Sequence, residues 1–136
     1  MADWNDFQRY IKTQYQGVKE LHGAQGLYGF EFDCKITPEG GATRSQRVMV
    51  SNVGGSWVQI ATIVCMEGDI APREALKRNA TMQFGALALY ETAGVMMLRH
   101  CFLLQDFDPS EFQVPLAPTA HYGDELEREL TGNDLW

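Results

Sequence analysis

The stretch from Met82 to Leu104 reads MQFGALALYETAGVMMLRHCFLL and decides how the rest of the sequence is interpreted. Two apolar runs flank Glu91-Thr92-Ala93-Gly94, and glycine supplies the backbone freedom that a tight reversal needs. We therefore predict a β-hairpin here, at the centre of an antiparallel sheet. The hairpin carries no obvious catalytic motif.

Three further strands are predicted before this hairpin. Residues 27–36 alternate apolar and polar side chains, as a half-buried strand does. Residues 44–53 end at the turn signal Gly54-Gly55, and residues 56–66 return as a strand that is apolar on both faces. The five strands together predict one antiparallel sheet.

Three helices complete the pattern. An apolar stripe at steps of three and four residues predicts a helix over residues 5–20. Residues 71–80 form a shorter helix, and residues 118–131 a last, acidic one that follows a proline-punctuated connection. The order α-β-β-β-α-β-β-α predicts a single α+β domain over residues 1–136, with the helices mainly on one face of a five-stranded antiparallel sheet.

The composition narrows the classes of partner and compartment. A net charge of −7 and a pI near 4.8 argue against nucleic acid, because phosphate binding needs clustered lysine and arginine. No apolar run approaches the ~20 residues of a membrane span, and the N-terminus lacks the apolar core of a signal peptide. The three cysteines favour reduced core thiols. We expect a cytoplasmic protein that binds neither nucleic acid nor membrane.

The C-terminal half resembles the YbjN-like and type III secretion chaperone-like family, and the rest of the chain matches it in element order only. The resemblance lies in Asn79 and in four segments: Phe84-Gly85-Ala86-Leu87-Ala88-Leu89, Leu98-Arg99-His100-Cys101-Phe102-Leu103-Leu104, Asp124-Glu125-Leu126-Glu127 and Leu130-Thr131-Gly132-Asn133-Asp134. It implies a small bacterial protein, usually a homodimer, that holds an extended segment of another protein. None of these motifs is catalytic.

Two histidines invite a chemical interpretation. His100 is followed by Cys101, but neighbouring side chains of a strand point to opposite faces, so the two cannot form a nucleophile–base dyad. His121 and Glu125 stand four residues apart on the last helix and could share a metal ion, but a site needs a further ligand. We predict no catalytic residue, no metal site and no cofactor.

The sheet face away from the helices is the more informative feature. One helical layer covers only one side of a sheet, so the other side is uncovered. In this sequence that side would carry apolar side chains. A contiguous apolar patch usually marks an interface, and methionine and tryptophan suit one that adapts to its partner. The predicted partner-binding residues are Met49, Trp57, Ile63, Phe84, Tyr90 and Met97.

These observations predict a non-enzymatic, chaperone-like or regulatory module that binds a protein or peptide segment, acting as a homodimer through the sheet face or an exposed strand edge. Two alternatives stay open. One is a small-ligand or metal-binding module, or an enzyme, with a pocket near His100, Tyr122 and the pair His121 and Glu125. The other is an acidic regulatory or immunity-type protein that neutralises a basic partner through its last helix.

Overall fold

The computed structural model describes residues 2–37 and 41–131. Its elements follow the order α1 (Trp4–Gln14), β1 (Lys19–Gly23), β2 (Gly26–Ile36), β3 (Arg44–Val53), β4 (Trp57–Met66), α2 (Pro72–Asn79), β5 (Ala86–Tyr90), β6 (Val95–Leu103) and α3 (Pro109–Thr131). Residues 132–134 of the family-like motif lie outside the described residues.

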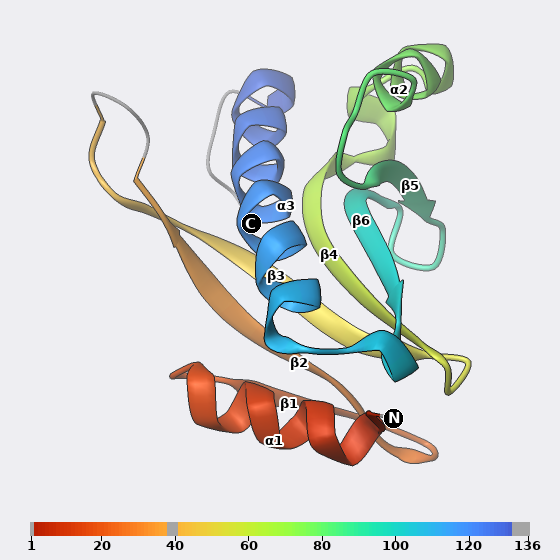
Figure 1. Ribbon diagram of the computed structural model, residues 1–136. Coiled ribbons are helices and arrows are strands. Elements are labelled where there is room, and N and C mark those ends of the chain that lie inside the picture. Colours follow the sequence, from red (N-terminus) through yellow and green to blue (C-terminus); the bar gives the residue numbers. More distant parts are fainter. Residues whose placement is uncertain (1, 38–40, 132–136) are drawn as a thin grey trace.

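The strands form one antiparallel sheet with the order β1-β2-β3-β4-β6-β5. Helices α1 and α3 pack on the same face of this sheet, and α2 lies beside the end that holds β5 (Figure 1). The predicted α+β class and antiparallel sheet are therefore confirmed. The predicted hairpin is present as β5 and β6, at one end of the sheet rather than in its middle.

The sheet has six strands rather than the five predicted, because the first helix is shorter than its apolar stripe suggests. A capping box between Asp3 and Asp6 begins α1, with both backbone-to-carboxylate hydrogen bonds at 2.9 Å. The chain leaves the helical path at the C-cap residue Tyr15, whose backbone is extended, and the positive φ of Gly17 (+68°) turns it further. Residues 19–23 then pair with the start of β2 as an additional strand.

The last helix begins earlier than predicted. Its buried side chains Phe112, Leu116 and Ala120 recur every four residues against the sheet, and this packing favours a continuous helix through Pro115 and Pro118. Proline lowers helix propensity, but burial of an apolar stripe overrides propensity when the packing is good. The segment predicted as a loop over residues 109–117 is therefore the first half of α3.

The core lies between the sheet and the helices in two parts. The larger part is rich in aromatic rings, and Phe7 of α1 meets Phe112 of α3 edge to face with ring centroids 5.5 Å apart. The smaller part gathers residues around Val64, Leu98 and Leu126, with Ala75 of α2 packed against them. Because every helix contributes to these clusters from one side, the opposite face of the sheet carries no helix of the described residues.

Candidate protein-binding surface

The strand register identifies the side chains of the helix-free face. Val50 of β3 lies opposite Ile60 of β4, and both are fully buried against the helices. Side chains alternate between the two faces along a strand, so the residues next to these two point to the helix-free side. We call this side the open face.

Rows of paired residues cross the open face from strand to strand. In one row Met49 lies opposite Ala61, and Ala61 lies opposite Arg99. In the next row Ile63 lies opposite Met97, which itself lies opposite Ala88. Met49, Ile63 and Met97 are each partly exposed and sit in adjacent rows. The strands thus bring these three predicted residues together.

Two aromatic side chains mark the ends of the open face. Trp57 begins β4, lies opposite Leu103 and is 44% exposed. Tyr90 ends β5 and is 48% exposed. Large aromatic side chains with this much exposure are enriched where proteins meet. Five of the six predicted partner-binding residues therefore share the open face.

Phe84 is the exception, and its predicted place on this face is wrong. Its ring lies 6.3 Å from that of His100, and both line a depression with Val114 and Pro115 of α3, on the helix-bearing side. Strand alternation does not extend back to Phe84 because β5 begins at Ala86. Gly85 has a φ of +76°, and a Cβ there would stand 2.7 Å from the carbonyl oxygen of Arg99.

Several polar groups of the open face are paired with one another. The Arg99 guanidinium donates to the Gln59 side-chain oxygen and to the Cys101 sulfur, each at 2.9 Å. On β3, Arg47 lies 3.4 Å from a carboxylate oxygen of Glu31 and 3.6 Å from one of Asp33. An apolar centre with paired polar groups beside it is the usual anatomy of a protein interface.

His100 lies on the opposite face from Cys101, as expected from the alternation of side chains. It is paired with Ile60 and is partly buried, and this desolvation lowers the pKa of its imidazole. The histidine is therefore neutral at physiological pH. The structure gives it no acid–base partner among the residues described.

The residues proposed for an alternative ligand or metal pocket do not converge. His121 pairs with Glu125 at 3.1 Å on the exposed side of α3, while His100 lines a separate depression. Over residues 2–37 and 41–131, no group of three histidine, cysteine or carboxylate side chains is placed to hold a metal ion. The geometry gives this alternative no support.

The carboxylates of the last helix are engaged within the chain. Asp124 is fully buried and forms a bidentate pair with Arg44 of β3, and Glu127 is fully buried as well. Glu125 pairs with His121, and Glu129 pairs with Arg78. A surface that captures a basic partner needs exposed carboxylates, and burial removes Asp124 and Glu127 from such a surface. Glu125 and Glu129 are exposed, but each is already paired with a cationic or histidine side chain of the same chain.

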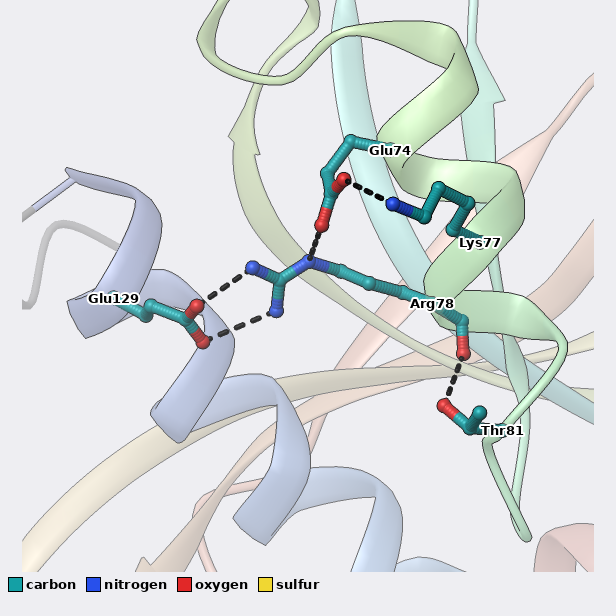
Figure 2. Close-up of polar contacts among 5 residues, drawn as sticks. All are labelled: Glu74, Lys77, Arg78, Thr81 and Glu129. Carbon is teal, nitrogen blue, oxygen red and sulfur yellow. Dashed lines mark hydrogen bonds and ion pairs between the residues drawn. The ribbon is translucent and has the colours of Figure 1, made fainter.

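Arg78 ties α2 to α3 (Figure 2). Its guanidinium donates to both carboxylate oxygens of Glu129, at 2.6 and 3.1 Å, and its Nε lies 3.6 Å from Glu74. The same contact lowers the pKa of the Glu129 carboxyl, chiefly through these hydrogen bonds. Thr81 donates to the Arg78 carbonyl oxygen and closes the end of α2.

A cavity of about 530 Å³ lies on the helix-bearing side, between β2, the end of α1 and the middle of α3. Sequence reasoning missed it because its walls join segments far apart in the chain. Its walls include Tyr15, Cys34, Ile36, Leu116, Ala117 and His121. Burial raises the pKa of the Cys34 thiol to about 12, so the cysteine behaves here as a small apolar side chain.

No family model matches this sequence, and no curated protein matches it. The fold itself is similar to that of a chain in the solved HopA1–SchA chaperone–effector complex, with a TM-score of 0.55 and 12% sequence identity. The match covers 90% of this chain and 88% of that chain. The similarity shows that the two chains share a fold. No helix in the described part of the chain is long and apolar enough to cross a membrane.

Proposed function

We propose that this chain is a non-enzymatic, chaperone-like module that binds a segment of another protein on its open face. The proposal rests on the strand register, which places Met49, Ile63 and Met97 next to one another on that face. Trp57 lies on the same face and is 44% exposed. The similarity to a chain of a chaperone–effector complex supports the same role. A flexible, methionine-containing patch suits a partner segment of varied sequence.

We further propose that the chain is a single YbjN-like or secretion-chaperone-like domain that acts as a bacterial homodimer in the cytoplasm. Its three cysteines are unpaired thiols, which suits a reducing compartment. In the homodimer, the open faces of two copies contact one another or jointly hold the partner segment. Burying Trp57 and Met97 in this way removes apolar surface from water, which favours association.

The substitution Trp57→Asp tests this proposal. A carboxylate buried in an apolar contact is desolvated without a partner, so association should be lost. Size-exclusion chromatography with light scattering should report twice the 15.3 kDa chain mass for wild type and the single chain mass for the variant. The variant should keep its fold, because Trp57 is 44% exposed in the isolated chain.

Val114→Asp is the matched control, because Val114 is 59% exposed on α3, away from the open face. It should leave the mass unchanged. A variant at Trp57 that unfolds would show that the tryptophan belongs to the core. A folded variant that keeps the dimer mass would exclude the open face as the contact between copies.

A further inference from the structure

The edge of β2 is free over its second half. β1 pairs with β2 only as far as Glu31, whereas β2 continues to Ile36 and pairs there with β3 alone. No other strand of the described chain lies beside residues 33–36, so one side of this segment presents unpaired backbone N–H and C=O groups. Figure 1 shows the β2–β3 hairpin extending past α1 and β1. Such an edge is a template for an added strand.

The 530 Å³ cavity runs along this edge. Its walls include the consecutive residues Asp33, Cys34, Lys35, Ile36 and Thr37. Side chains alternate between faces in a strand, so consecutive residues can line one cavity only where the cavity borders the backbone edge. On the helix-bearing side the cavity is bounded by α3, which contributes the apolar residues Leu116, Ala117 and Ala120 and the polar residues Gln113 and His121.

Charged side chains flank the edge on the open side. Asp33 and Lys35 lie two residues apart on this side, and the Asp33 side chain is 57% exposed. Directly opposite residues of antiparallel strands interact, and opposite charges there are favourable. An added antiparallel strand would therefore favour an acidic residue opposite Lys35 and a basic residue opposite Asp33. The residue between them, opposite Cys34, would point to the cavity.

We propose that the free edge of β2 and the adjoining cavity form a docking site for an extended polypeptide segment with the pattern acidic–apolar–basic. The segment adds to β2 as an antiparallel strand and places its apolar side chain between Ile36 and α3. Charge complementarity with Asp33 and Lys35 sets its register. The inference rests on the proposed protein-binding role but uses a surface separate from the open face.

Two labelled nonapeptides with blocked termini test this site. They share a flank of alternating threonine and valine, and their centres read glutamate-leucine-lysine or lysine-leucine-glutamate. Fluorescence anisotropy should show that wild type binds the first about fivefold more tightly than the second, from two cross-strand charge pairs. The double variant Asp33→Lys, Lys35→Asp should reverse this preference. Binding should also slow amide hydrogen exchange in residues 33–36.

Two single variants locate the site. Ala117→Trp fills the cavity from an exposed position of α3 and should abolish binding of both peptides, while the matched change Ala80→Trp, at an exposed residue beyond α2, should leave it intact. Trp57→Asp should bind the peptides as wild type does. The proposal is overturned if wild type binds neither peptide, or if Trp57→Asp abolishes binding while Ala117→Trp does not. Neither result bears on the dimer measurement, which tests the open face separately.

Discussion

Gly123 sets how closely α3 approaches the sheet. A Cβ at this position would stand 2.3 Å from the Cγ2 methyl of Thr62 on β4, far inside normal contact. Alanine normally stabilises a helix relative to glycine by about 1 kcal/mol. Here we expect Gly123→Ala to lower the free energy of unfolding by about 1–3 kcal/mol, as overpacking of a core does. Urea denaturation measures the change.

The substitution Thr62→Ser supplies the control for this prediction. It removes the methyl group but keeps the hydroxyl, which accepts from Gln46 and donates to the Arg47 carbonyl oxygen, both at 2.7 Å. In the Thr62→Ser background, Gly123→Ala should cost much less stability. An equal cost in both backgrounds would show that the two residues are not in contact.

Arg78 and Glu129 act at the scale of the element, because they hold α2 against α3. Glu129→Gln should loosen α2 by roughly 0.5 kcal/mol, the value typical of a partly exposed pair. Amide hydrogen exchange in residues 72–79 should be faster in the variant at neutral pH. Glu125→Gln is the control, because Glu125 pairs with His121 on its own helix. This variant should leave hydrogen exchange in α2 unchanged.

The ion pair between Arg78 and Glu129 depends on pH, and the direction of the shift in the Glu129 pKa sets that dependence. Arg78 lowers the pKa of the Glu129 carboxyl in the folded chain. The ion pair therefore contributes its full stabilisation above the pKa that glutamate has in the unfolded chain, about 4.3. It is lost as the pH falls through the lowered value. The difference in α2 exchange between wild type and Glu129→Gln should therefore vanish in acid. A difference that persists at the lowest pH would contradict the assignment.

The elements show what the sequence could and could not predict. Alternation and glycine turns predicted β2 to β6, because strand periodicity is a local signal. The sequence did not reveal β1, because Tyr15 and Val18 continue the apolar spacing of the first helix although the helix ends at Gln14. The prolines of α3 suggested a loop, and only tertiary packing of Phe112 and Leu116 maintains the helix there.

At the scale of the whole molecule, the open face was partly predictable. Its strand residues follow from alternation, and Phe84 was misplaced because strand geometry does not extend across Gly85. The buried pair of Asp124 and Arg44 was not predictable, because the two residues are 80 positions apart and a helical acid normally faces water. The cavity beside β2 likewise depends on where β1 stops pairing, which is a property of the assembled sheet.

The central claim is that the open face is covered when this protein associates. The most direct test is the NMR relaxation of the methionine methyl groups in the presence of a water-soluble paramagnetic probe. It is measured for wild type and for Trp57→Asp. Met49 and Met97 should be protected in wild type and exposed in the variant. Met82 and Met96, which pack against the smaller core cluster, should not change. Equal accessibility of Met49 and Met97 in both proteins would contradict the account.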